Sequence, residues 1–164
     1  MKKIYDTTDA ASGLQNQFTS SQSATFQEAV GILESRLRST AAFTSPVEVK
    51  QYCRLKIGHK KDEHFCCLFL DTKHRLIAFE RLFRGTIDGA AVHPRVVVRR
   101  ALELNAAAVI FTHNHPSGVT EPSSADIKIT KRLKDALGFI DVRVLDHIVV
   151  GTADATSMAE SGLI

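Results

Sequence analysis

The sequence is poor in cysteine, and its three cysteines follow no metal-binding or disulfide pattern. Cys53 stands alone, and Cys66 and Cys67 are adjacent within an apolar run. An odd cysteine count without a C-x-x-C pair argues against a disulfide framework and against a cysteine-based zinc knuckle. We therefore expect free, buried cysteines that pack as small apolar side chains. Any metal ligands must then be histidines and carboxylates.

The sequence also lacks a long hydrophobic segment. Its apolar runs, such as "FCCLFL" and "AAAVIF", are far too short to cross a bilayer. The opening "MKKIYDTTDA" continues with acidic residues and threonines instead of the apolar stretch of a signal peptide. These absences predict a cytoplasmic protein without a membrane partner.

A strong charge of either sign is missing as well. The formal net charge is +3, and the short basic clusters at 59–61, 99–100 and 131–132 fit ordinary helix surfaces or loops. Basic residues do not alternate with aromatic ones in the manner of single-strand binders. DNA is therefore a conceivable partner that the charge pattern does not indicate.

What the chain does have is the composition of one ordinary globular domain. Its 164 residues suffice to bury a core. Residues 1–44 form a polar segment rich in Ser, Thr, Gln and Asn, with a helix predicted over 24–38 from apolar spacings of three and four. Residues 45–164 are predicted to form the compact domain.

Within the compact domain, strands and helices are expected to alternate. A short helix is predicted from Ser45 and Pro46, because proline suits the first helical position. Strands are predicted at 64–71 and 75–86, joined as an antiparallel hairpin, and at 106–115 and 142–151; helices are predicted at 93–105 and 122–138. This order favours an α/β (α+β) fold, with a mixed sheet flanked by helices.

One stretch, "IFTHNHPSGVTEPSSAD", carries a candidate metal site. Side chains two residues apart on a strand point to the same face, so His113 and His115 should lie together. "PSG" then turns the chain, and Asp126 falls in the first turn of the next helix, from which its carboxylate can reach back. Two nitrogens and one oxygen would leave a fourth position of a tetrahedral zinc ion for water, which is the catalytic arrangement.

Each of these residues also has an ordinary interpretation. An H-x-H pair on a strand can be incidental, and Asn114 between the histidines can be a polar residue next to a turn. Ser123 and Asp126 form an S-x-x-D pattern, which is a helix capping box. The joint occurrence of these features favours the metal site.

The motifs "HNHPSG", "PSSAD" and "LDHIVVG" resemble the RadC-like branch of the JAB/MPN metalloprotease superfamily, whose JAMM signature is a glutamate, then H-x-H-P, then S-x-x-D. The resemblance extends over about residues 45–164 and implies the cytidine-deaminase-like architecture of that superfamily. The chain departs from the pattern in two places. Val96 replaces the usual glutamate of "HPRE", and residues 1–44 are too short for a helix-hairpin-helix region.

The resemblance implies a role for each site residue. His113, His115 and Asp126 would bind one zinc ion per chain, and Ser123 would stabilise the oxyanion of the reaction. Glu63, just before the first core strand, is the favoured general base, with Glu80 in the second strand as its competitor. His147 could orient a ligand from behind, although a plain core histidine is the simpler expectation.

The implied function is a zinc metallopeptidase or isopeptidase acting on a protein or peptide whose identity the sequence does not specify. A DNA-repair-associated accessory protein with little or no hydrolase activity is the alternative. A deaminase is the weakest option, because the H-x-E and P-C-x-x-C ligand motifs of that chemistry are missing. The oligomeric state stays open.

Overall fold

The structure is a computed structural model of the chain, and it describes residues 19–39, 45–85 and 91–164. The first part of the polar segment predicted over residues 1–44 lies outside this range. So does the expected domain boundary after residue 44.

A single mixed sheet of five strands forms the centre of the molecule. The strand order across the sheet is β2-β1-β3-β4-β5. Only β3 and β4 pair in parallel, and the other neighbours pair antiparallel. The strands are β1 (His64–Leu70), β2 (Leu76–Arg84), β3 (Ala108–Asn114), β4 (Arg143–Val150) and β5 (Ala155–Ser157).

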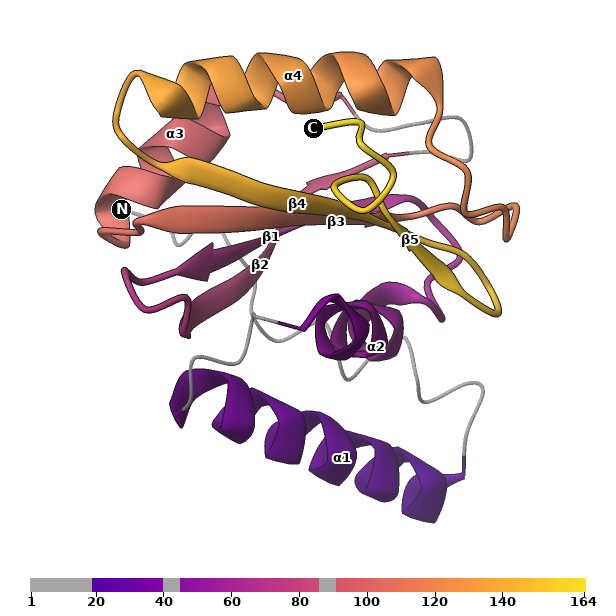
Figure 1. The fold of residues 1–164 in the computed structure, drawn as a ribbon. Helices are drawn as coiled ribbons and strands as arrows, with labels where there is room; N and C mark the ends of the chain where they lie inside the picture. The colour runs from indigo at the N-terminus through magenta and orange to yellow at the C-terminus, as the bar shows by residue number, and fades with distance from the viewer. Residues whose placement is uncertain (1–18, 40–44, 86–90) are drawn as a thin grey trace.

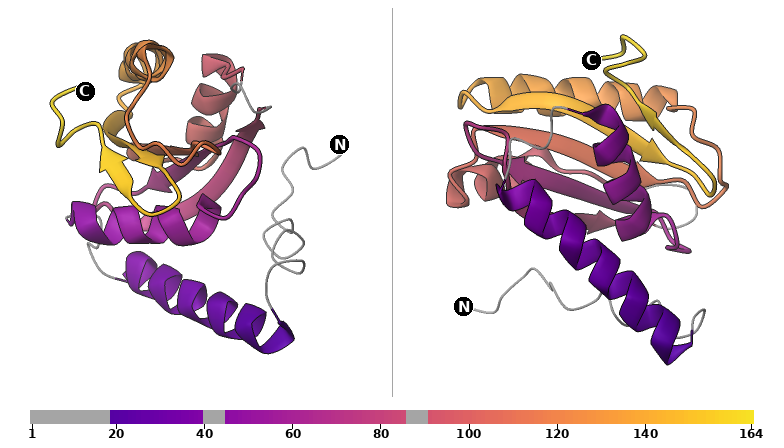
Figure 2. Two further views of the ribbon diagram at one scale, coloured as in Figure 1. Left: turned by 90° about the vertical axis from the view of Figure 1, so that its right-hand side faces the viewer. Right: turned by 60° about the horizontal axis from the view of Figure 1, so that its bottom comes forward.

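Helices cover both faces of this sheet, so the molecule has layers (Figure 1). On one face lies α2 (Pro46–Ile57), with α1 (Ser20–Ser39) packed outside it. On the other face lie α3 (Pro94–Glu103) and α4 (Ser124–Gly138), which contact each other. The two turned views in Figure 2 show the same separation, with α1 and α2 together on one side of the sheet.

The central strands are buried along their whole length because helices cover both of their sides. All seven residues of β1 and all seven of β3 are buried, as expected for strands enclosed on both faces. Alternate residues supply separate cores. Cys66, for example, joins the core under α2, and Cys67 joins the core under α3 and α4. All three cysteines are free and buried, as predicted.

The expected elements are present, with shifts at their ends. The predicted hairpin is confirmed by the antiparallel pairing of β1 with β2, and the α/β fold with a mixed sheet is confirmed. Helix α1 begins at Ser20, four residues before its predicted start at residue 24. The sequence analysis missed β5, which has only three residues and therefore no measurable periodicity. None of the helices in the described ranges is long and apolar enough to cross a membrane.

Candidate metal centre

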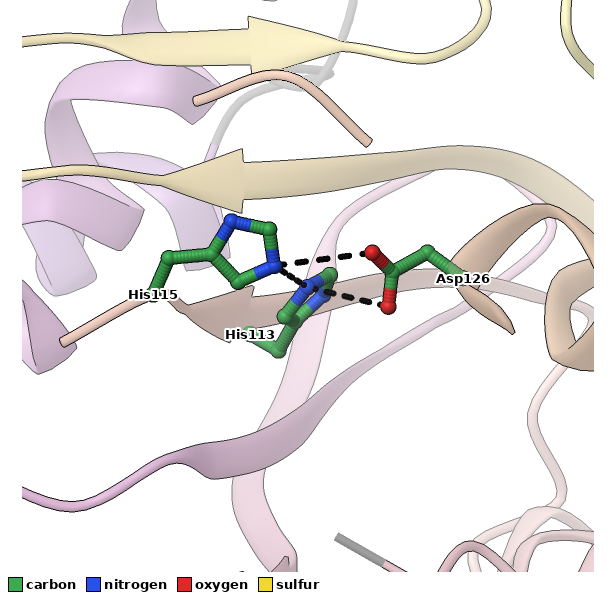
Figure 3. A group of neighbouring side chains, drawn as sticks. All are labelled: His113, His115 and Asp126. Atoms are coloured by element: carbon green, nitrogen blue, oxygen red, sulfur yellow. Dashed lines mark hydrogen bonds and ion pairs between the residues drawn. The ribbon is translucent and has the colours of Figure 1, made fainter. Parts of the chain in front are cut away.

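The two histidines and the aspartate singled out in the sequence meet at the end of β3. Figure 3 shows His113 and His115 pointing toward the carboxylate of Asp126. The Nε2 atoms of the two histidines lie 2.9 Å apart. The Nε2 of His113 is 3.2 Å from one oxygen of Asp126, and that of His115 is 3.5 Å from the other. The three residues form a group that could hold a metal ion.

These separations fit a tetrahedral zinc ion. With bonds of about 2.0–2.1 Å, neighbouring ligand atoms of such an ion lie roughly 3.3 Å apart. The two histidine nitrogens are 2.9 Å apart, and each lies 3.2 or 3.5 Å from a different oxygen of Asp126. With one ligand atom taken from each residue, the three atoms lie within 4.8 Å of one another, so small side-chain movements would bring them to the spacing of a tetrahedral site.

A tight turn and a helix cap bring Asp126 to the histidines. After β3 the chain turns back at once, with the Gly118 amide donating to the His115 carbonyl at 2.9 Å. Gly118 has a φ of +85°, and a Cβ there would lie 2.6 Å from Oγ1 of Thr152, so only glycine fits. Helix α4 then starts with Ser123 as its cap, and Asp126 completes the predicted capping box.

The Asp126 carboxylate thus serves both the helix and the histidines. Its Oδ2 accepts from the Ser123 amide at 2.7 Å and from the Ser123 hydroxyl at 2.6 Å. The two interpretations of the S-x-x-D pattern, a capping box and a metal ligand, are therefore compatible. The cap fixes the orientation in which the carboxylate faces the histidines.

A backbone carbonyl fixes the ring of His115. Its Nδ1 lies 2.8 Å from the carbonyl oxygen of Val119, which can only accept a hydrogen bond. Nδ1 therefore carries a proton, and Nε2 is the nitrogen that faces the cluster. This is the usual way in which the second nitrogen of a metal-binding histidine is held.

His113 is held more tightly and from behind. It is 1% exposed, and its ring stacks on Phe65 with an interplanar angle of 12°. Its Nδ1 lies 2.8 Å from Nε2 of His147, which is fully buried in β4. His147 therefore contacts the candidate ligand directly, as the less favoured of its two predicted roles requires.

The surroundings of Asp126 favour the charged form of its carboxylate. Burial raises the pKa of Asp126, but hydrogen bonds from His113 and His115 outweigh burial and hold this pKa well below its usual range. The hydrogen bond to Asp126 raises the pKa of His115 in turn. Burial lowers the pKa of His147 far below its usual value, so this ring is neutral. The Asp126 carboxylate is therefore in the charged form that a metal ligand needs.

The two candidate glutamates lie in different surroundings. Glu63 immediately precedes β1 and lies two residues before Phe65, which pairs with His113 across β1 and β3. The Glu63 carboxylate also contributes to the raised pKa of His115. Glu63 therefore lies beside the cluster.

Glu80 is engaged elsewhere. It is 7% exposed in the middle of β2, and its carboxylate oxygens accept from Arg100 of α3 at 2.5 and 2.7 Å. Strand β1 separates β2 from the strand that carries the histidines. The structure thus gives Glu80 a structural ion pair and leaves Glu63 as the glutamate near the cluster.

Sequence reasoning underrated Asn114. This residue is 2% exposed, and its side-chain oxygen accepts from the His64 amide at 2.9 Å. Its side-chain nitrogen donates to the carbonyls of Lys60 and Asp62 at 3.2 and 3.0 Å. Asn114 thus fixes the loop that carries Glu63. The only signal for it in the sequence is its place between the two histidines.

Sequence reasoning also missed Thr130, whose hydroxyl lies 2.6 Å from Nδ1 of His147. Its spacing of four residues from Asp126 puts both on one side of α4. That spacing is a signal, although many helices contain such a pair without any site.

Several known proteins are similar in sequence to this chain. A family model described as "RadC-like JAB domain" matches residues 43–163. A UPF0758 protein of Stutzerimonas stutzeri is 62% identical over 130 residues, which are 79% of this chain and 58% of the relative. A UPF0758 protein of Azotobacter vinelandii is 57% identical with the same coverage. One of Marinobacter nauticus is 53% identical over 86% of this chain and 63% of the relative. The matched part thus spans about three fifths of these longer relatives.

Proposed function

Because this chain belongs to the RadC-like JAB domain family, we propose that it is a zinc-dependent hydrolase of amide bonds. Its substrate would be a protein or peptide, cleaved at a peptide or isopeptide bond. The observation that carries the proposal is the convergence of His113, His115 and Asp126 at separations that suit a tetrahedral ion. Three ligands from the protein are the number typical of catalytic zinc sites.

The donor set supports zinc over the common alternatives. Two neutral imidazole nitrogens and one carboxylate oxygen suit zinc, whereas magnesium and calcium prefer sites made of oxygen alone. A zinc ion bound here supplies a lowered pKa for water and polarises a substrate carbonyl. Proton transfer and hydrogen bonding to the substrate oxygen are left to side chains of the protein.

Glu63 is the proposed general base. Its carboxylate takes up a proton from the attacking water and later delivers it to the nitrogen of the leaving amine. Support comes from the place of Glu63 two residues before Phe65, the strand partner of His113, and from its electrostatic interaction with His115. Three hydrogen bonds of Asn114 hold the segment around Glu63 in place.

Ser123 is the proposed donor to the substrate oxygen. Its hydroxyl stands at the exposed start of α4, next to Asp126. By rotating about its Cβ–Oγ bond, the hydroxyl can leave the carboxylate and donate to the oxygen on which negative charge develops. One such donor is typically worth about 3 kcal/mol of transition-state stabilisation.

The test combines metal analysis with two glutamate variants. We expect one zinc per purified chain by elemental analysis. Hydrolysis is measured on a library of linear and lysine-branched peptides, with new amino termini read by mass spectrometry. Glu63→Gln should keep the metal and lower turnover about 100- to 10,000-fold, as for loss of a general base.

Glu80→Gln is the matched control. It should leave turnover per folded molecule and bound zinc unchanged, but lower the free energy of unfolding by about 3 kcal/mol because Arg100 loses a buried partner. A chain that cannot be loaded with zinc would refute the proposal. Loss of turnover in folded, zinc-loaded Glu80→Gln would move the base to Glu80.

A further inference from the structure

A buried chain of hydrogen bonds connects two of the proposed ligands behind the metal centre. It runs from Nδ1 of His113 to Nε2 of His147 at 2.8 Å. From Nδ1 of His147 it continues to the Thr130 hydroxyl at 2.6 Å, and from there to the backbone carbonyl of Asp126 at 2.6 Å. His113, Thr130 and His147 are each at most 1% exposed, so water does not substitute for any of these contacts.

The direction of the chain follows from its last member. A carbonyl oxygen only accepts hydrogen bonds, so the single hydroxyl proton of Thr130 is donated to Asp126. The Thr130 oxygen must then accept from His147, which requires a proton on Nδ1 of His147. The alternative, in which Thr130 donates to the ring, would leave the contact with the Asp126 carbonyl without a proton.

The same reasoning gives the direction of the hydrogen bond between His147 and the proposed metal ligand His113. A fully buried imidazolium beside a divalent ion is strongly disfavoured, so the His147 ring is neutral and its Nε2 carries a lone pair. That lone pair accepts from Nδ1–H of His113. A neutral His113 ring with a proton on Nδ1 has a lone pair on Nε2, the atom that faces Asp126 and His115.

We infer that Thr130 and His147 are positioning residues that set the tautomer of His113 and thereby the affinity of the centre for zinc. This inference rests on the proposed zinc site. Thr130 touches neither His113 nor the position of the ion, and it acts through His147. A purely structural role would be an ordinary helical hydroxyl bond to the carbonyl four residues back, together with a core histidine. The two roles differ in what happens to the ring protons.

Removing the Thr130 hydroxyl should reverse the donor–acceptor direction of the hydrogen bond between His147 and His113. In Thr130→Val, Nδ1 of His147 loses its acceptor, and the tautomer of His147 with a proton on Nε2 becomes the favoured one. That proton is donated to Nδ1 of His113, so the proton of a neutral His113 moves to Nε2 and blocks the metal-binding atom. Thr130→Ser keeps a hydroxyl in place and should keep the original direction.

The experiment measures ring protonation and zinc affinity on the same chain. Long-range ¹H–¹⁵N NMR of histidine-labelled protein reads which nitrogen of His147 carries the proton. Competition with a chromogenic chelator gives the dissociation constant of zinc. We expect His147 protonated on Nδ1 in the wild type, and Thr130→Val to bind zinc about 10- to 100-fold more weakly, as for other residues that orient a ligand. Thr130→Ser should restore wild-type affinity.

Thr112→Val is the matched control, because Thr112 is a buried threonine beside His113 whose hydroxyl has no partner among the described residues. Its zinc affinity should equal that of the wild type. The inference is wrong if Thr130→Val binds zinc like the wild type and keeps the proton on Nδ1 of His147. In that case the proposed zinc site stands.

Two further outcomes are also decisive. If Thr130→Val does not fold, the wild type alone decides, because a proton on Nε2 of His147 contradicts the inference. If the wild-type chain binds no zinc at all, the proposed function fails, and this inference fails with it.

Discussion

The two faces of strand β3 differ in whether their buried polar groups have hydrogen-bond partners. Toward α2, the hydroxyl of Thr112 is buried and has no hydrogen-bond partner among the described residues. Toward α4, the neighbouring residue His113 has a partner at each ring nitrogen. A buried polar group without a partner costs stability, whereas a satisfied network fixes one arrangement of its members. Thr112 on the α2 face therefore carries a stability cost, whereas the polar groups on the α4 face are held in one arrangement, as a site requires.

The largest expected effect is on the α4 face, where His115→Ala removes a proposed ligand. We expect zinc affinity to fall more than about 100-fold, beyond the loss typical of residues that only orient a ligand. The dissociation constant of zinc is the measurement. The matched control is His74→Asn in the β1–β2 hairpin, because Asn tolerates the φ of 59° at that position. Equal zinc affinities in the two variants would contradict the proposed metal site on the α4 face.

Asn114→Ala tests whether a buried polar residue outside the α4 face also contributes to function when its hydrogen bonds are satisfied. Asn114 follows His113 on β3, so its side chain points to the opposite face, and it makes three hydrogen bonds. Their loss should lower the free energy of unfolding by about 2–3 kcal/mol. It should also lower turnover while zinc affinity stays unchanged, because only the loop that carries Glu63 is released.

Urea unfolding and zinc competition check this prediction, with Gln51→Ala as an exposed-amide control. A variant that is destabilised but fully active per folded molecule would limit Asn114 to a structural role.

His64 should make the α2 face sensitive to acid. His64 is 6% exposed and alternates with Cys66 of the α2-side core. Burial, followed by Arg81, lowers its pKa to about 4. Because this pKa lies below the value of about 6.5 in the unfolded chain, the unfolded state binds the proton first as the pH falls. The stabilisation is complete above pH 6.5 and is lost between about pH 6.5 and 4.

We expect this loss to reach about 2 kcal/mol in the wild type and to be reduced in His64→Gln. Urea unfolding of both proteins at pH 7, 6, 5 and 4 measures the difference, from which the shared contribution of carboxylates cancels. Parallel curves for the two proteins would show that His64 is not the responsible group.

The smallest effect is expected from Thr112→Val, which replaces an unpartnered hydroxyl by a methyl group. The free energy of unfolding should stay the same or rise by up to about 1 kcal/mol. The same replacement on the other face, Thr130→Val, should lower it by about 1–2 kcal/mol, because Thr130 has two polar partners. Equal losses at both positions would contradict the difference between the faces. Thermal unfolding of the two variants measures it.

The sequence was sufficient for features that depend on neighbours along the chain. The strand period predicted that His113 and His115 share a face, and the S-x-x-D pattern predicted the cap that holds Asp126. Apolar runs predicted the central strands, and Pro46 and Pro94 predicted helix starts. The short strand β5 was missed because three residues carry no period.

Contacts between distant segments were decided only by the tertiary structure. The sequence left Glu63 and Glu80 as competitors, and the register of β1 against its neighbours separated them. The same packing places Asn114 where its side chain hydrogen-bonds the start of β1. It also brings His147 of β4 into hydrogen-bond contact with Thr130 of α4. Local rules fix the direction of a side chain, but which residues meet across strands depends on the register of the whole sheet. The sequence by itself therefore determined the three proposed ligands, and the fold decided what surrounds them.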